Sequence, residues 1–182
     1  MKRWYRNLSE FVQTLERAGE LKTVARPVSH YLDISRYTDA ESKSPQGGKA
    51  LLFKTVKGSP FPAATNLFGS PKRICMALGV DDLDRLGERI RRMIEMPPPN
   101  SFKDVLGLLP TALSVSRFFP RRSRAQRPPC QEVVYTGEAV DLELLPVLHC
   151  WPKDAGRFIT LPLVFTRSLK TGRRNVGMYR LQ

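Results

Sequence analysis

Three consecutive prolines, at 97–99, interrupt the chain and constrain its fold more than any other feature. Proline fixes φ and has no amide hydrogen to donate, so neither a helix nor a central strand continues through such a run. Before the prolines, helix-like and strand-like patterns alternate, whereas from Cys130 onward the pattern is that of β-structure. We therefore divide the chain into an N-terminal α/β domain over residues 1–100, a connector over 101–129 and a β-rich segment over 130–182.

The N-terminal part carries clear helix starts. Asn7 with Glu10 three residues later has the spacing of a capping box, and Ser70 followed by Pro71 suits an N-cap and a first helical position. Residues 81–96 place their apolar side chains on one helical face and begin with aspartates, as expected of an amphipathic helix. The sequence therefore predicts helices after Asn7, after Ser70 and over 81–96, with a weaker one over 32–42.

Strands are expected where β-favouring runs lie between turn signals. These runs are residues 21–28, 50–56, 61–68, 130–137, 157–168 and 173–182. The last two flank "LKTG", which predicts a hairpin with Gly172 in its turn. The segment "SPQGGK" at 44–49 lacks the spacing of a phosphate-binding loop and leads into a strand, so we predict a turn. Strands mixed with helices in this order indicate an α/β or α+β fold.

The charge of the chain is strongly positive, +13 with a pI near 10.2. The connector contributes six basic residues against one acidic residue: Lys103, Arg117, Arg121, Arg122, Arg124 and Arg127 against Asp104. Such a stretch could bind nucleic acid, with Phe118 and Phe119 stacking on bases, or anionic lipid headgroups. No RNA- or DNA-binding motif accompanies it, so we favour a solvated basic strap and expect no nucleic-acid partner.

Cysteine and histidine offer little for catalysis or metal binding. Cys75, Cys130 and Cys150 form no CxxC pair, which argues against a zinc ribbon or a redox motif. His149 precedes Cys150 directly. Because neighbouring residues in an extended segment point to opposite faces, the two are poorly placed for Cys–His catalysis, and we predict a partly buried loop pair instead. The N-terminus lacks the apolar core of a secretory signal and no window is apolar enough to span a membrane, so we expect a cytoplasmic protein.

The final decapeptide, "RRNVGMYRLQ", places an amide, Asn175, five residues before a guanidinium, Arg180. An asparagine oxygen is a neutral ligand for a hard cation such as Mg²⁺ or Mn²⁺, and an arginine binds a carboxylate with two parallel hydrogen bonds. An amphipathic strand with a surface arginine is the plainer interpretation, and the pattern alone leaves both open.

Several short stretches, in order, resemble the UbiD family of prenylated-FMN-dependent decarboxylases. They are "GELK", "ALLF", "NLFGSPKR", "CWPKDAGRFITLPLVFTR" and, most of all, "NVGMYRLQ". The branch acting on 4-hydroxy-3-polyprenylbenzoate in ubiquinone biosynthesis looks most similar. The resemblance implies an N-terminal α/β domain followed by the first strands of a flavin-reductase-like split β-barrel, which would be truncated here because the family continues into a C-terminal α/β domain.

The resemblance also implies a site. In the family, prenylated FMN lies on the barrel, its phosphate bridged to the protein by Mn²⁺ (or Mg²⁺) with K⁺ nearby. The metal-binding asparagine matches Asn175, the cofactor-binding tripeptide matches Met178, Tyr179 and Arg180, and the catalytic arginine that orients the substrate carboxylate also matches Arg180. The expected partners are an aromatic carboxylic acid substrate, a flavin prenyltransferase that supplies the cofactor, further copies of the full-length chain, and the inner membrane face as a peripheral contact.

The family's other metal ligands and its acid–base carboxylates would lie beyond Gln182, so we expect the 182-residue chain alone to be inactive. A truncated paralogue that acts as a binding subunit, and a basic nucleic-acid-binding module, are the alternatives.

The spacing of Asn175 and Arg180 poses a geometric problem. They are an odd number of residues apart, so a regular strand would point them to opposite faces. We therefore predict a bulge or irregularity at or next to Gly177, which would allow both side chains to address one cofactor.

Overall fold

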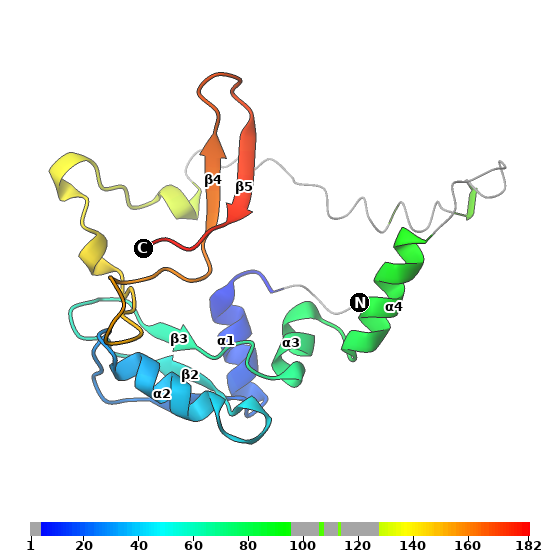
Figure 1. Ribbon diagram of the computed structural model, residues 1–182, viewed down its shortest axis with the longest axis horizontal. Helices are drawn as coiled ribbons and strands as arrows, with labels where there is room; N and C mark the ends of the chain where they lie inside the picture. The colour runs from blue at the N-terminus through cyan, green and yellow to red at the C-terminus, as the bar shows by residue number, and fades with distance from the viewer. Residues whose placement is uncertain (1–4, 96–105, 108–112, 114–127) are drawn as a thin grey trace. The chain divides into compact units, whose positions relative to one another are not determined.

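The computed structural model describes residues 5–95, 106–107, 113 and 128–182 (Figure 1). The predicted basic connector falls almost wholly outside these residues. The chain groups into two compact units, one formed by residues 1–83 with 141–182 and the other by residues 84–140. No helix among the described residues is long and apolar enough to cross a membrane.

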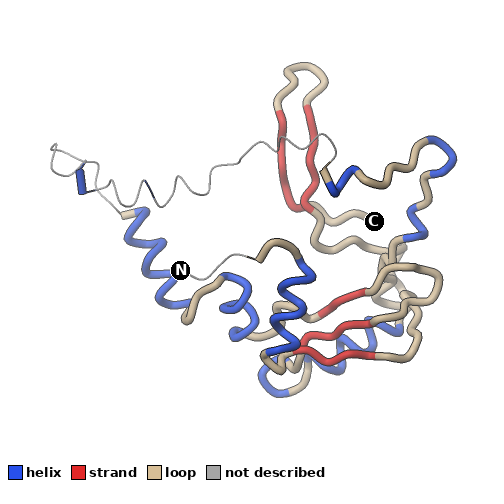
Figure 2. The backbone as a smooth tube through the Cα atoms, turned by 180° about the vertical axis from the view of Figure 1, so that it is seen from behind, coloured by secondary structure: helices blue, strands red, loops and turns tan. Residues whose placement is uncertain are grey.

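The first unit contains a small mixed sheet, whose strands are drawn in red in Figure 2. Strand β2 (Ala50–Phe53) lies in the middle, parallel to β1 (Leu21–Val24) and antiparallel to β3 (Ala63–Thr65). Helix α2 (Asp33–Ser42) makes the crossover from β1 to β2, as a parallel pair requires. The helices α1 (Leu8–Arg17) and α3 (Pro71–Leu78) complete this part.

Both faces of β2 are buried, which explains its uninterrupted apolar sequence. On one face, Leu51 and Phe53 pack with Ile34 of α2. On the other face, Ala50 packs with Phe11 and Leu15 of α1. The predicted α/β character of the N-terminal part is therefore confirmed.

The remaining elements are shorter. The second unit contains the helix α4 (Leu83–Ile94), whose first residue lies at the unit boundary, and the 3₁₀ turns Pro129–Gln131 and Gly137–Ala139. Further 3₁₀ turns are Pro45–Gly47 and Leu142–Leu144, and the last strands are β4 (Leu163–Arg167) and β5 (Arg174–Met178). The described strands form only the three-stranded sheet and the two-stranded ladder β4–β5. Neither closes into a barrel, so the split barrel stays a prediction.

The predicted helix starts are confirmed by their hydrogen bonds. The amide of Glu10 donates to Asn7 Oδ1 at 2.9 Å, and the amide of Arg73 donates to Ser70 Oγ at 3.2 Å. Each bond satisfies one of the amides that a helix N-terminus leaves without an intrahelical acceptor. The predicted helix over 81–96 is observed as α4, and the one over 32–42 as α2.

The strand predicted over 130–137 is wrong. The segment contains 3₁₀ turns at both ends, and Val133, Val134 and Tyr135 between them are exposed. β-branched and aromatic residues favour strands only where a neighbouring strand and a buried face receive them, and in the described part of the chain this segment has neither. The strands predicted over 21–28 and 50–56 are shorter than expected, although an isolated bridge between Val28 and Val56 extends their pairing.

A buried arginine organises the turn at 44–49. Arg73, with no solvent-exposed surface, donates to the carbonyls of Gly47 and Gly48 and to Glu20 Oε2. The Asn66 side-chain amide donates to Gly47 O at 2.8 Å as well. The turn thus presents carbonyl oxygens to cationic and amide donors, the opposite of a loop that binds phosphate through its N–H groups. The predicted turn is confirmed.

Two glutamates make the stability of this unit depend on pH. The pKa of Glu20 lies below its ordinary value, chiefly because Lys72 donates a hydrogen bond to it, and the pKa of Glu41 is lowered chiefly by the Lys49 backbone amide. A carboxyl whose pKa is depressed by folding stabilises the protein above the unfolded-state pKa and loses that contribution as pH falls through the folded-state pKa. We expect the free energy of unfolding to fall below about pH 5.

Urea unfolding at pH 7 and at pH 4 measures this loss. A variant with Glu20→Gln and Glu41→Gln cannot titrate at these positions, so its stability should decrease less between the two pH values. An equal decrease in the variant and the parent chain would show that other groups carry the pH dependence.

Candidate functional site

The candidate site lies at the end of the hairpin β4–β5, drawn in orange and red in Figure 1. The strands pair antiparallel, with Asn175 opposite Thr166 and Met178 opposite Leu163. Gly172 adopts a positive φ of 67° in the connecting turn, a conformation that glycine adopts readily. The predicted hairpin and the role of Gly172 in its turn are confirmed.

The two faces of this hairpin differ in chemistry. Residues opposite one another in an antiparallel ladder share a face, so Asn175, Thr166 and Gly177 lie on one side. The other side carries four exposed apolar side chains, those of Leu163, Phe165, Val176 and Met178, and the arginine pair Arg167 and Arg174 at the turn end. Asn175 thus shares its face with Thr166 and Val164, and Met178 lies on the opposite face.

No bulge is present at Gly177, and the irregularity lies one residue further on, where the ladder ends. Gly177 pairs regularly with Val164, and the ladder continues to Met178. The strand ends there; Tyr179 and Arg180 lie outside it, and Leu181 pairs instead with Ile159. The alternation of faces between Asn175 and Arg180 is therefore interrupted by the end of the ladder rather than by a bulge.

Tyr179 explains the glycine at 177. A Cβ atom on Gly177 would lie 2.8 Å from Tyr179 Cζ and 2.9 Å from its hydroxyl oxygen, both too close for van der Waals contact. The Tyr179 ring therefore lies against the bare backbone of Gly177. A side chain at 177 would therefore require the exposed Tyr179 ring to move, and Gly177 itself has no unusual backbone conformation.

Arg180 is held by its neighbours while its side chain stays exposed. The residue after it, Leu181, exchanges backbone hydrogen bonds of 2.9 and 3.2 Å with Ile159. The Arg180 guanidinium carbon lies 5.1 Å from the centroid of the Phe158 ring, within the range of a cation–π interaction. No carboxylate of the described chain forms a salt bridge with Arg180, so its N–H groups are available to an added anion.

The described residues do not by themselves form a site for a divalent metal. Asn175 is exposed and offers one neutral oxygen, whereas Mg²⁺ and similar hard cations take about six oxygen ligands. No group of three histidine, cysteine, aspartate or glutamate side chains in the described residues is placed to hold a metal ion. Asn175 can therefore act only as one ligand among others.

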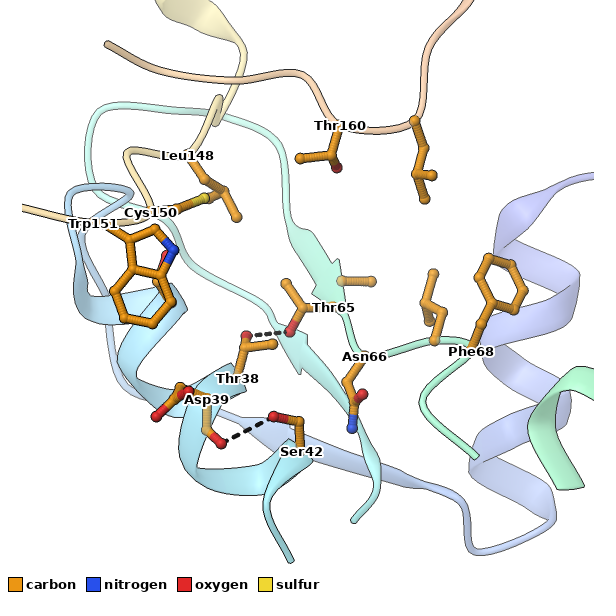
Figure 3. A pocket seen from close by; sticks show the side chains of 14 residues that line it. Thr38, Asp39, Ser42, Thr65, Asn66, Phe68, Leu148, Cys150, Trp151 and Thr160 are labelled. Carbon is orange, nitrogen blue, oxygen red and sulfur yellow. Dashed lines mark hydrogen bonds between the residues drawn. The ribbon is translucent and has the colours of Figure 1, made fainter. Parts of the chain in front are cut away.

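The structure brings together a second group of residues that sequence reasoning did not single out. A pocket of about 520 Å³ lies between α2, the segment that follows β3, and the segments around Cys150 and Thr160 (Figure 3). Its walls come from four separate stretches of the chain, so no local motif could have indicated it. His149 and Cys150 are partly buried as predicted; Cys150 lines the pocket, and the His149 ring lies 4.7 Å from the Tyr31 ring.

Two family models match the chain. One, described as 3-octaprenyl-4-hydroxybenzoate carboxy-lyase N-terminal domain, matches residues 12–93. The other, described as 3-octaprenyl-4-hydroxybenzoate carboxy-lyase Rift-related domain, matches residues 121–182 and so includes Asn175 and Arg180. A protein of Aquifex aeolicus whose function is uncharacterized is 43% identical over 98% of this chain. The chain spans 36% of that relative's length.

Solved structures of UbiD-class enzymes share the fold. Vanillic acid decarboxylase of Sedimentibacter hydroxybenzoicus in its closed form is 26% identical, with a TM-score of 0.73 over all of this chain and 36% of its own. HmfF of Pelotomaculum thermopropionicum in complex with FMN is 26% identical, with a TM-score of 0.66 over 96% of this chain and 34% of its own. An evolved dimeric form of HmfF contains prFMN.

The two matched models are successive domains of one family. They agree with the structural likeness in covering the mixed α/β part, the hairpin β4–β5 and the residues after it, which include Arg180. The chain therefore belongs to the UbiD family of carboxy-lyases and corresponds to about the first third of the length of its solved relatives.

Proposed function

We propose that this chain supplies part of the active site of a decarboxylase that uses prenylated FMN to remove CO₂ from an aromatic carboxylic acid. The observation that carries the proposal is Arg180, an exposed guanidinium fixed beside the Phe158 ring, without a carboxylate partner in the described chain. It lies in the family's Rift-related domain, and relatives of that family are seen with FMN or prFMN.

Each site residue has a separate role in this proposal. Arg180 binds the substrate carboxylate through parallel N–H donors and orients it. It must hold that group without stabilising the charged ground state more than the transition state, because the product, CO₂, is neutral. Met178 and Tyr179 would contact the cofactor beside Arg180, and Asn175 would give one oxygen to a Mn²⁺ or Mg²⁺ that helps to hold the cofactor. The cofactor, when bound, supplies the electron sink.

For the substrate we propose 4-hydroxy-3-polyprenylbenzoate, as in ubiquinone biosynthesis. The matched family models carry the name of a 3-octaprenyl-4-hydroxybenzoate carboxy-lyase. A lipid-like substrate also fits a cytoplasmic enzyme in peripheral contact with the inner membrane face, and the net charge of +13 favours contact with anionic lipid. The proposed partners are a flavin prenyltransferase that supplies the cofactor and further copies of the full-length chain.

The test is a decarboxylation assay on a protein that joins this chain to the remaining domains of a UbiD enzyme, produced together with a flavin prenyltransferase. We expect 4-hydroxy-3-polyprenylbenzoate to be consumed faster than vanillate or 3,4-dihydroxybenzoate. A preference for the simple acids would overturn the substrate, and absence of CO₂ release from every aromatic acid would overturn the reaction.

The 182-residue chain alone should neither bind prenylated FMN tightly nor release CO₂. No group of three histidine, cysteine, aspartate or glutamate side chains in the described residues could hold a metal ion, and Asn175 offers one oxygen where a hard cation needs about six. Titration with prenylated FMN and Mn²⁺, followed by flavin absorbance, measures this. A spectral change with micromolar affinity would contradict the expectation, and the same titration with Asn175→Ala controls for nonspecific flavin binding.

A further inference from the structure

Arg180 contacts an aromatic ring rather than a carboxylate, and the kind of partner decides what the arginine can still bind. Its guanidinium carbon lies 5.1 Å from the centroid of the Phe158 ring. A cation over a ring face is attracted by the π electrons and uses none of its N–H donors for this contact. The described residues give the Arg180 side chain neither a salt bridge nor a hydrogen bond. The ring therefore restrains the cation while the guanidinium N–H groups remain free for a ligand.

The Phe158 backbone is fixed by the N-terminal α/β part. Its amide donates to Leu148 O at 2.9 Å, and Leu148 packs against the buried core around β2. The next residue, His149, is bound to the turn that precedes α2: its amide donates to His30 O at 3.2 Å, and its carbonyl accepts from the Leu32 amide at 3.1 Å. The position of Phe158 is thus set by contacts with residues more than 100 positions earlier in the chain.

The same segment also fixes the backbone of Arg180. Ile159, directly after Phe158, pairs antiparallel with Leu181, directly after Arg180. Phe158 and Arg180 are each one residue away from this bridged pair, so both side chains point to the face opposite to Ile159 and Leu181. On that face they are diagonal neighbours, a separation that an aromatic ring and a long side chain can span. The contact of ring and guanidinium is therefore a consequence of the backbone pairing.

Phe158 suits a role as a support for this arginine. A free surface arginine samples many rotamers and loses that freedom when it binds a ligand. A ring that holds the guanidinium beforehand reduces this loss, which is the general benefit of preorganisation. An acidic partner at the same place would neutralise the charge and occupy the N–H donors, whereas phenylalanine does neither.

We infer that Phe158 is the positioning residue of Arg180: it holds the guanidinium in one orientation before a carboxylate binds, and so lowers the KM for the acid. The identity of the ligand as an aromatic carboxylate rests on the proposed function. The contact between Phe158 and Arg180 belongs to the 182-residue chain itself and needs no cofactor, so it can be measured separately.

The first test is NMR spectroscopy of the 182-residue chain without cofactor. The Arg180 side-chain resonances are assigned by their absence in Arg180→Lys, and the ring current of Phe158 should displace them from the ordinary arginine position. Phe158→Leu removes the ring, so we expect the resonances to return to the ordinary position, whereas Phe158→Tyr should keep the displacement. Unchanged resonances in Phe158→Leu would overturn the inference, because the ring would then not hold Arg180.

The second test measures kcat and KM of the protein that joins this chain to the remaining UbiD domains. Phe158→Leu should raise the KM for the aromatic acid about three- to fivefold and leave kcat within about twofold, because it removes the ordering of Arg180 but not the arginine itself. Phe158→Tyr should restore the KM of the parent enzyme. A merely structural role would lower kcat through loss of folded enzyme and leave KM unchanged, and that result would overturn the inference.

Phe61→Leu is the matched control. Phe61 is an exposed phenylalanine just before β3, and its ring has no cation–π contact within the described residues. Its replacement should change neither the Arg180 resonances nor the KM, and an equal rise in KM would count against a specific role for Phe158. If the parent enzyme released CO₂ from no aromatic acid, the proposed function would be wrong, and the NMR comparison would by itself decide whether Phe158 positions Arg180.

Discussion

Replacing Arg73 by methionine is expected to lower the free energy of unfolding by about 3–5 kcal/mol. The methionine keeps much of the side-chain volume but removes every donor. The carbonyl of Gly48 and one Glu20 oxygen would then lose their partner in a place where water does not reach Arg73, and the carbonyl of Gly47 would keep only Asn66 as a donor. Loss of one partner from a buried ionic network leaves the others uncompensated, which is why the effect is large.

Lys72→Ala is the matched control, because Lys72 also binds Glu20, at 2.7 Å, but its side chain is largely exposed. An exposed ion pair contributes about 0–1 kcal/mol, so this variant should unfold at almost the same urea concentration as the parent chain. Equal losses in the two variants would contradict the assignment of Arg73 as the residue that holds the turn at 44–49.

Replacing Arg180 by leucine or lysine is expected to lower the decarboxylation rate by on the order of 10²–10³-fold, the usual effect of losing a positioned charge at a reacting group. This prediction rests on the proposed function and applies to the protein that carries the complete set of UbiD domains. Lysine should not rescue the rate, because an ammonium group cannot reproduce two parallel N–H donors in one plane. The rate of CO₂ release measures the effect, with the flavin spectrum recorded to show that the cofactor is still bound.

Arg174→Leu is the control for this experiment. Arg174 is exposed at the start of β5, opposite Arg167, and is not among the residues proposed to contact cofactor, metal or substrate. Its replacement should leave the rate within about twofold of the parent enzyme. An equal loss in both variants would show that general charge, rather than the position of Arg180, supports the reaction.

The sequence predicted much of the local structure because local chemistry decides it. Asn7 and Ser70 start helices through hydrogen bonds within one turn of the chain, and Gly172 marks a hairpin whose partner strand is only a few residues away. The order of residues in "NVGMYRLQ" also indicates the UbiD family, and the matched family model that includes Arg180 agrees.

Features that depend on a distant partner were predicted poorly. The run "CQEVVYTG" has strand composition but no neighbouring strand in the described chain, so it forms turns. Lys72 and Arg73 stand side by side at the start of α3, and only the packing of that helix shows that one is largely exposed and the other is buried. Likewise, Gly177 was expected to bend the strand, whereas it makes room for the Tyr179 ring.

By itself, then, the sequence determined the positions of the main helices, the turn at 44–49, the closing hairpin and the family, because each depends on neighbouring residues or on their order. Only the tertiary structure decided where β5 ends, what Arg73 binds, and that α2, the residues after β3 and the segments around Cys150 and Thr160 meet in one pocket. The physical reason is that these contacts join residues far apart in the chain, and their energies depend on burial and on partners that no local pattern records.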